Sequence, residues 1–433
     1  CGVYFYFSQL EGQIDDCECS VNTVDYFNNL KIYPRLNSLL LKDFFRFYRV
    51  NLERGCPFWP DFKRCTTEHC SVETCSEGQV PAGLSTEAKN GKESSAHKYL
   101  KEAQNEEDCD ENHGGLGAVD RTLSEETKEE FEKWQKYDES QDNFCETEGE
   151  SLTDVKYVDL HRNPERFTGY KGVSSHRVWK SIYQENCFKP DHEHGPFTTS
   201  KNLGELCLEK RAFFRAISGL HTSITVHLCA THYTPSKTGF GSGNWGLNVP
   251  EFLKRFSTDQ TDGEGPDRLK NLYFVYLLEL RALAKAALYI EAQSFYTGDD
   301  VEDAEVKSAV TELLSIIKSF PNHFKESVLF PGKDEETAKL KEEFRQHFIN
   351  ITRIMDCVGC DKCRLWGKLQ TEGLGTALKI LFSGKLDSDL KMPQLKKNSF
   401  HLTRKEIVAL FNAFGRLSTS VYQLENFRKL IKS

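Results

Sequence analysis

Fifteen cysteines in a chain of 433 residues constrain this protein more than any other feature of its sequence. The number is too high for incidental core residues, and the density is too low for a small scaffold built on disulfides. Reduced compartments use clustered cysteines for metal binding or redox catalysis, whereas oxidising compartments use them for structural disulfides. Because the count is odd, at least one thiol stays unpaired or bonds outside the chain.

Composition and charge narrow the class of protein. Hydrophobic residues make up 38% of the chain, enough for a sizeable core, and the net charge of −9 argues against binding along nucleic acid. The most apolar stretch, 269–290, carries Lys270, Glu279, Arg281 and Lys285, so it is typical of a buried helix rather than a membrane span. We therefore expect no transmembrane segment, and any membrane association would be peripheral. The sequon at Asn350 predicts N-glycosylation and a secretory-pathway address.

Apolar residues recur at helical spacing over most of the chain beyond residue 154. No convincing series of alternating strands accompanies them. The sequence therefore predicts a mainly α fold, with residues 1–433 forming a single helical domain that carries cysteine-rich loops. We expect helices at 173–183, 203–230, 268–290, 341–355, 403–417 and 421–431, and a helical stretch at 25–41 that Pro34 interrupts.

Two adjoining segments have the composition of loops. Residues 56–75 contain four cysteines together with Pro57 and Pro60. Residues 76–117 are rich in Gly, Ser, Glu, Asn and Lys and almost lack aromatic residues. Such composition is typical of a mobile segment. We therefore expect a mobile loop at about 60–117, with Cys109 inside it.

The strongest chemical motif is Cys357-Val-Gly-Cys360-Asp-Lys-Cys363. The last two cysteines follow a glycine, at the expected start of a helix reaching residue 369. A helix N-terminus stabilises a thiolate, and the C-x-x-C spacing suits a redox pair. Three alternatives remain open. The motif could contribute to a zinc site completed by His69 or another cysteine, to an iron–sulfur site that lacks its usual later Cys-Pro, or to a structural disulfide.

A second cluster has the even spacing Cys65-x₄-Cys70-x₄-Cys75. Evenly spaced thiols on a mobile segment can exchange partners, which would make a switch. Two ordinary loop disulfides would explain the same spacing, and the spacing alone favours them. In combination with the C-x-x-C motif, however, the cluster could serve as a shuttle between an outside partner and an inner pair.

Electrons taken from thiols need an acceptor, and the sequence has neither a metal-binding box nor a Gly-rich dinucleotide turn. A flavin held between helices would be one solution. Ser218 and His221 lie three residues apart on one helical face, and Arg255 and Arg268 could bind a pyrophosphate. Each of these residues could equally be an ordinary polar or surface residue. Composition and spacing therefore do not establish a flavin.

Several strings in the sequence resemble the endoplasmic reticulum oxidoreductin family, in the same order along nearly the whole chain. They are Cys56-Pro-Phe-Trp59, Asn163-Pro-Glu-Arg-Phe-Thr-Gly-Tyr-Lys-Gly172, Glu185-Asn-Cys-Phe-Lys-Pro190, Ile217-Ser-Gly-Leu-His221, Gly263-Glu-Gly-Pro266, Arg268-Leu-Lys-Asn-Leu-Tyr273 and Met355-Asp-Cys-Val-Gly-Cys-Asp-Lys-Cys-Arg-Leu-Trp-Gly367.

The resemblance implies an FAD-dependent thiol oxidase of the endoplasmic reticulum lumen, with the flavin in a helix bundle. Members oxidise protein disulfide isomerase and related thioredoxin-like proteins, and they pass electrons through FAD to oxygen, which yields hydrogen peroxide. A zinc- or disulfide-stabilised secreted binding module without catalysis is the alternative from another class.

The resemblance also implies roles for individual cysteines. Cys65 and Cys70 match the shuttle pair, and Cys360 and Cys363 match the inner pair, with Cys363 nearer the flavin. In a locked state Cys65 would pair with Cys109, and Cys70 with Cys75, so the loop at 60–117 would be regulatory. The structural disulfides implied are Cys56–Cys357 and Cys187–Cys207. The pairing of Cys1, Cys17 and Cys19 and the roles of Cys145 and Cys229 remain unassigned.

The implied FAD contacts come from five separate places in the chain. Stacking of flat rings, a hydrogen bond to the cofactor and neutralisation of phosphate charge are the roles that such residues supply. The matching residues are Arg166, Thr168, Trp179, Ser218, His221, Arg255 and Arg268.

Overall fold

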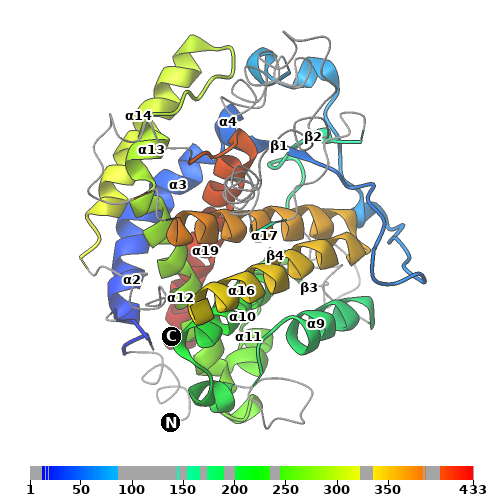
Figure 1. The fold of residues 1–433 in the computed structure, drawn as a ribbon, viewed down its shortest axis with the longest axis vertical. Coiled ribbons are helices and arrows are strands. Elements are labelled where there is room, and N and C mark those ends of the chain that lie inside the picture. The colour runs from blue at the N-terminus through cyan, green and yellow to red at the C-terminus, as the bar shows by residue number, and fades with distance from the viewer. Residues whose placement is uncertain are drawn as a thin grey trace, which may run out of the picture.

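The fold is mainly helical, as the sequence predicts, in a computed structural model of the chain (Figure 1). The described residues are 12–14, 16–17, 19–85, 144–145, 154–165, 173–189, 200–234, 244–321, 335–383, 386 and 400–432. None of the helices in these ranges is long and apolar enough to cross a membrane. The division of the chain into a single domain stays a prediction.

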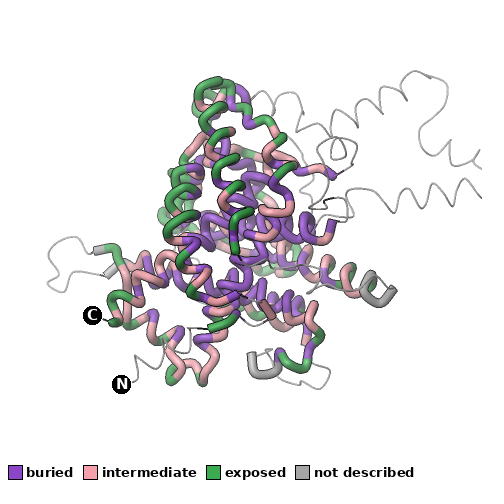
Figure 2. Tube along the Cα trace, turned by 90° about the vertical axis from the view of Figure 1, so that its left-hand side faces the viewer, coloured by how far each residue is buried: buried purple, intermediate pink, exposed green. Residues whose placement is uncertain are grey.

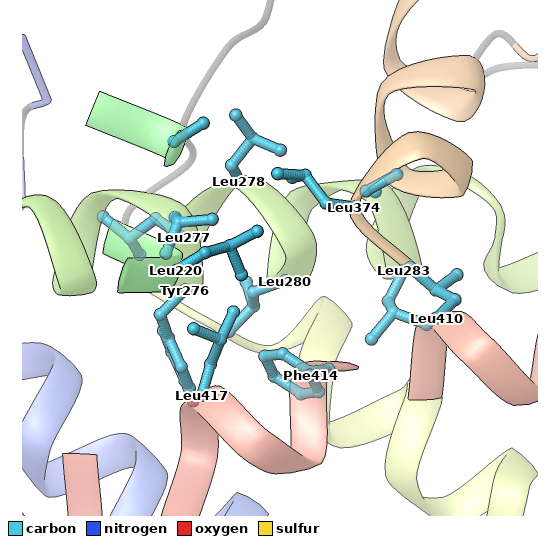
Figure 3. Packing of buried hydrophobic residues seen from close by; sticks show 14 of the residues in the cluster. Leu220, Tyr276, Leu277, Leu278, Leu280, Leu283, Leu374, Leu410, Phe414 and Leu417 are labelled. Carbon is cyan, nitrogen blue, oxygen red and sulfur yellow. The ribbon is translucent and has the colours of Figure 1, made fainter. Parts of the chain in front are cut away.

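Four long helices form the core: α10 (Leu208–Ala230), α12 (Glu264–Lys285), α17 (Asp361–Phe382) and α19 (Arg404–Lys432). Each presents apolar side chains to the others at helical spacing. Figure 3 shows these side chains meeting from all four helices. They include Leu220 of α10, Tyr276, Leu277, Leu280 and Leu283 of α12, Leu374 of α17, and Leu410, Phe414 and Leu417 of α19.

Glycines allow the core helices to approach closely. A Cβ atom added at Gly219 of α10 would lie 2.3 Å from the backbone oxygen of Asn271 in α12. A Cβ atom added at Gly373 of α17 would lie 2.4 Å from the Cβ of Ala413 in α19. Interiors are packed at crystal-like density, so neither position has room for a larger residue.

The remaining helices surround this core, and their outer faces carry most of the exposed residues (Figure 2). In Figure 1, α16 lies beside α17, and α14 runs along the edge of the molecule. The surrounding elements are α2 (Val21–Phe27), the π-helix η1 (Asn28–Ile32), α3 (Tyr33–Leu39), α4 (Asp43–Arg46), α9 (Val173–Glu185), α11 (Val249–Phe256), α13 (Ala287–Glu291), α14 (Asp300–Lys318) and α16 (Glu335–Ile354), with short 3₁₀ helices at Glu68–Cys70, Glu77–Gln79, Ser200–Glu205, Thr258–Gln260 and Met355–Cys357.

Two short antiparallel ribbons complete the described structure. Strand β1 (Phe47–Val50) pairs with β2 (Lys156–Asp159), with Tyr48 opposite Val158. Strand β3 (His232–Thr234) pairs with β4 (Asn244–Gly246). An isolated antiparallel bridge joins Thr74 to Val158, so the cysteine-rich segment at 70–75 lies beside β2.

Several helix boundaries differ from the sequence predictions. The helix expected at 203–230 begins at Leu208, and the one expected at 268–290 is divided between α12 and α13. Pro34 does not interrupt the helical path, because it lies in the first turn of α3, where a missing N–H costs little, and a π-helix precedes it. The two helices expected at 403–417 and 421–431 are one helix, α19. The polar residues between them are satisfied by other helices: Ser418 donates to the Asn28 side chain at 2.6 Å, and Ser420 contacts the Ser223 hydroxyl at 2.8 Å.

Candidate redox site and adjoining pocket

Cys360 and Cys363 lie at the start of α17, as their spacing after Gly359 predicts. Cys360 has extended backbone and immediately precedes the helix, and Cys363 lies in its first turn. The side chains of both residues are buried. Hydrogen bonds from the Cys363 thiol, the Cys70 thiol and the backbone N–H groups of Cys363 and Lys362 lower the pKa of Cys360 to about 6. A helix N-terminus thus holds this sulfur as a thiolate.

The turn before Cys360 is fixed by a covalent bond and by buried charge. A disulfide joins Cys357 to Cys56 across 301 positions of sequence. The neighbouring Asp356 is buried and forms an ion pair with Lys368 at 2.7 Å. This is the Cys56–Cys357 bond that the family resemblance implies.

Arg364 ties the same turn to the segment after β1. Its side chain is fully buried, and its guanidinium donates to the carbonyl oxygens of Val358 at 3.0 Å and Leu52 at 2.7 Å. The centroid of the Phe62 ring lies 5.2 Å from the guanidinium carbon of Arg364. Arg364 therefore links the turn before α17 to the chain between Leu52 and Phe62.

The first two cysteines of the second cluster lie directly against the inner pair. The backbone N–H of Cys65 donates to the carbonyl oxygen of Gly359 at 2.8 Å. Cys70 is fully buried in a small cluster with Cys360 and Cys363, and Cys65 packs against its edge. Residues 295 positions apart in sequence (65 and 360) thereby become neighbours.

The two sulfurs of this segment have different environments. Burial and the hydrogen bond to Cys360 raise the pKa of Cys70 far above its usual range. Cys65 is partly exposed, and hydrogen bonds from Thr67 and from the Cys70 thiol lower its pKa. Cys65 can therefore meet an outside partner, whereas Cys70 faces inward.

The Cys70–Cys75 disulfide expected for a locked state is absent from this structure. Cys70 contacts Cys360 instead, while Cys75 is held by its N–H bond to the carbonyl oxygen of Tyr157 at 2.8 Å. The side chain of Cys75 packs in a separate apolar cluster with Phe47, Val80 and Leu84. Cys109, the expected locked partner of Cys65, lies outside the described residues, as does the loop at 86–117.

A pocket adjoins the inner pair between α9, α10 and the start of α17. Cys363 and the indole of Trp179 both line it, together with Val178, Ile224 and Met355. The walls are mostly apolar. A flat, largely apolar group could therefore reach the Cys363 sulfur.

Trp179 belongs to an aromatic stack beside this pocket. Its ring lies 3.7 Å from that of His221 at an interplanar angle of 10°, and Tyr183 Oη lies 3.1 Å from His221 Nδ1. Burial, followed by the charges of Arg268 and Arg255, lowers the pKa of His221 to about 3. The imidazole is therefore neutral at physiological pH and can donate or accept a hydrogen bond.

The two predicted phosphate-binding arginines line a second pocket. Arg255 pairs with Glu251 at 2.7 Å, and Arg268 pairs with Glu264 at 2.6 Å. Ser218 is buried and accepts a hydrogen bond from the Asn271 side chain at 3.0 Å. Five of the seven expected FAD contacts are thus gathered near α9, α10, α11 and α12. Arg166 and Thr168 lie outside the described residues.

The expected Cys187–Cys207 disulfide is not formed in this structure. Cys187 is buried after α9, whereas Cys207 is exposed immediately before α10, so the two sulfurs have opposite environments.

The remaining expected sites lie elsewhere in the structure. Cys145 donates to the carbonyl oxygen of Thr371 at 3.5 Å. Asn350 of the sequon lies partly buried within α16. Within the described ranges, no group of three or more His, Cys, Asp or Glu side chains is placed to hold a metal ion.

Sequence reasoning missed several residues that shape the site. Tyr183 and Arg364 act through contacts that only folding creates; no sequence signal marks Tyr183, whereas Arg364 directly follows Cys363 in the strongest motif. Thr67 could have been found, because it lies between the two cysteines of a short motif.

Comparisons with known proteins show which family the chain resembles. A family model described as Endoplasmic Reticulum Oxidoreductin 1 (ERO1) matches residues 31–424. The chain is 50% identical to the Ero1-like protein of Drosophila melanogaster, over 98% of this chain and 91% of that protein. It is 51% identical to the ERO1-like protein alpha of Homo sapiens, over 99% of this chain and 92% of that protein. The solved structure titled "Structure of Ero1p, Source of Disulfide Bonds for Oxidative Protein Folding in the Cell" matches with a TM-score of 0.61 and 26% identity, over 95% of this chain and 97% of that chain.

Proposed function

The chain belongs to the endoplasmic reticulum oxidoreductin 1 family, and we propose that it is an FAD-dependent thiol oxidase of the endoplasmic reticulum lumen. Its substrates would be protein disulfide isomerase and related thioredoxin-like proteins, its electron acceptor would be oxygen, and its by-product would be hydrogen peroxide. The single observation that supports this most is the contact of Cys70 with Cys360. Through the buried Cys70, the partly exposed Cys65 is linked to a buried cysteine pair beside a pocket.

The first exchange takes place at the shuttle pair. A substrate thiolate attacks Cys65 of the Cys65–Cys70 disulfide, and Cys70 leaves as a thiolate. The second substrate thiolate then attacks the substrate sulfur, and Cys65 leaves. The substrate gains one disulfide, and the shuttle pair is left as two reduced sulfurs. The partial exposure of Cys65 and the full burial of Cys70 support this direction.

The second exchange takes place inside the protein. Cys70 attacks Cys360 of the Cys360–Cys363 disulfide, and Cys363 leaves as a thiolate. Cys65 then attacks Cys70, which restores the shuttle disulfide and releases Cys360. Thiols with a low pKa leave faster, and hydrogen bonds at the start of α17 lower the pKa of Cys360 to about 6. The helix start therefore favours the release of Cys360.

The residues beside Cys363 fit FAD. Trp179 and Cys363 line the same mostly apolar pocket, which suits an isoalloxazine ring. Arg255 and Arg268 are close enough to His221 to lower its pKa, so phosphate-binding charge lies near the same stack. When bound, FAD supplies a two-electron acceptor that oxygen reoxidises. Cys363 would face the ring, His221 would hydrogen-bond it, and the arginines would hold the pyrophosphate.

Visible spectroscopy of the purified protein tests this proposal. We expect a flavin absorption band that bleaches when a dithiol is added without air and returns when air is admitted. Cys363→Ala should keep the band but lose the bleaching. The control is Cys145→Ala, because Cys145 contacts α17 at Thr371 rather than at the start of the helix; this variant should behave as the unaltered protein.

The alternative function is a secreted binding module, stabilised by zinc or disulfides and without catalysis. It predicts a colourless protein that consumes no oxygen with a dithiol, even after incubation with FAD. That result would overturn the oxidase proposal.

A further inference from the structure

Thr67 lies between the two shuttle cysteines, and its hydroxyl contacts the outer one. The Thr67 Oγ1 atom lies 3.2 Å from Cys65 Sγ. We propose that Thr67 is a further catalytic residue of the thiol oxidation, whose hydroxyl and backbone N–H hydrogen-bond the Cys65 thiolate each time that thiolate forms. This role rests on the proposed function, because it concerns the same shuttle pair.

The local backbone explains why the hydroxyl is available. Thr67 immediately precedes the 3₁₀ helix Glu68–Cys70, a position where threonine hydroxyls often cap a helix. Here the hydroxyl makes no capping hydrogen bond. The Thr67 carbonyl instead accepts the backbone N–H of Cys70 at 2.9 Å, so one turn positions both shuttle cysteines around the hydroxyl.

The electrostatics of Cys65 agree with this arrangement. The Thr67 hydroxyl is the largest cause of the lowered pKa of Cys65, followed by the Thr67 backbone N–H and by the Cys70 thiol. The titratable groups facing the sulfur are Cys70, which lowers the pKa by a hydrogen bond, and Cys360, whose charge raises it. A neutral hydroxyl donor therefore acts where the neighbouring charge is unfavourable.

Cys65 must carry the electron pair as a thiolate twice in each cycle. It does so first when the substrate disulfide closes and the bond between Cys65 and the substrate breaks. It does so again before it attacks Cys70, when the Cys65–Cys70 bond forms and the Cys70–Cys360 bond breaks. In neither step does Thr67 lose a proton or electrons, because its hydroxyl only donates a hydrogen bond. The stabilised thiolate leaves faster in the first step and is more abundant in the second.

The test compares two neighbouring substitutions in the reduced protein. Thr67→Val removes the hydroxyl and keeps the side-chain shape, and Thr66→Val makes the same change at the adjacent exposed position. Iodoacetamide alkylation of Cys65 is measured against pH by mass spectrometry of the peptide. We expect Thr67→Val to move the midpoint to higher pH and to slow alkylation near neutral pH about fivefold, the effect of one ordinary hydrogen bond. Thr66→Val should leave the profile unchanged, and Thr67→Ser should restore it.

Equal alkylation profiles for Thr67→Val and Thr66→Val would overturn the role of Thr67. The readout needs neither FAD nor oxygen, so it is independent of the oxidase proposal. If alkylation shifts but no variant oxidises a dithiol, the oxidase proposal fails while the contact of Thr67 with Cys65 stands. If turnover with a thioredoxin-like substrate does not fall together with alkylation, the contact exists without a catalytic role.

Discussion

Asn163 is hydrogen-bonded through its side-chain amide to both backbone groups of Glu73. Its Nδ2 donates to the Glu73 carbonyl oxygen at 2.9 Å, and its Oδ1 accepts the Glu73 N–H at 2.7 Å. The backbone carbonyl of the fully buried Asn163 in turn accepts the indole N–H of Trp366 at 2.7 Å. Glu73 lies three residues after Cys70, and Trp366 lies three residues after Cys363. One asparagine therefore connects the segments that carry the two cysteine pairs.

Replacing Asn163 with Ala should misalign Cys70 and Cys360. The change removes three hydrogen bonds to the backbone, two to Glu73 and one to the Asp159 carbonyl oxygen, and leaves buried polar groups unpaired, which costs about 1–3 kcal/mol of stability. Asn412→Ala is the matched control, because Asn412 is also buried and donates to the backbone oxygens of Phe45 and Val408. We expect similar losses in urea-unfolding free energy for both variants, but slower turnover of a thioredoxin-like dithiol only for Asn163→Ala. Equal turnover in the two variants would contradict the alignment role.

The thiolate of Cys360 should depend on Cys70. The folded pKa of Cys360 is about 6, below the usual value for a thiol, so the thiolate predominates at neutral pH and is lost as the pH falls through 6. Cys70→Ala removes one of the hydrogen bonds that lower this pKa and should shift the midpoint upward. Alkylation of Cys360 against pH in the reduced protein measures the shift. Cys75→Ala is the control, since Cys75 packs in a different cluster, and a similar shift there would argue against the Cys70 contact.

Two buried histidines should make the fold sensitive to acid. The folded pKa of His221 is about 3 and that of His227 is about 4, both lowered first by burial. Below their ordinary value of about 6.5, the unfolded chain binds more protons than the folded one, so stability falls as the pH drops. Each histidine contributes a slope of up to about 1.4 kcal/mol per pH unit, present between about 6.5 and its folded pKa.

The check is urea unfolding at several pH values from about 7 to about 5. His227→Gln cannot take up a proton, so its unfolding free energy should fall less steeply with acid than that of the unaltered protein. Identical slopes would contradict the lowered pKa, because they would mean that His227 binds protons equally in the folded and unfolded states.

The close approach of α10 and α12 should not tolerate a methyl group at Gly219. An added Cβ would lie 2.3 Å from the Asn271 backbone oxygen, so the helices would have to move apart. We expect Gly219→Ala to lower the melting temperature strongly, since overpacking a core costs about 1–3 kcal/mol or more. Gly204→Ala is the control, because its Cβ would meet nothing within 4 Å. Equal melting temperatures for the two variants would contradict the tight packing.

Local patterns predicted much of the helical structure. The spacing of Phe213, Ile217 and Leu220 predicted α10, because one apolar face per helix is a local property of sequence. The same reasoning failed at Pro34 and between the two halves of α19. In both places the outcome depends on neighbours: the π-helix before Pro34 and the partners of Ser418 and Ser420 are visible only in the folded chain.

The sequence by itself determined which residues could do redox chemistry. The C-x-x-C pair after Gly359 predicted a thiolate at a helix start, and the even spacing of Cys65, Cys70 and Cys75 was compatible with exchangeable thiols, although the spacing alone favoured two loop disulfides. These are short-range properties, since helix dipoles and local spacing act over a few residues.

Only the tertiary structure decided which thiols meet. It brings Cys70 against Cys360, leaves Cys75 in another cluster and leaves Cys187 and Cys207 without a disulfide between them. Disulfide exchange requires contact between sulfurs, and contacts between residues hundreds of positions apart depend on how the whole core packs. For that reason the cysteines could be counted and grouped from sequence, but the route between them could be read only from the fold.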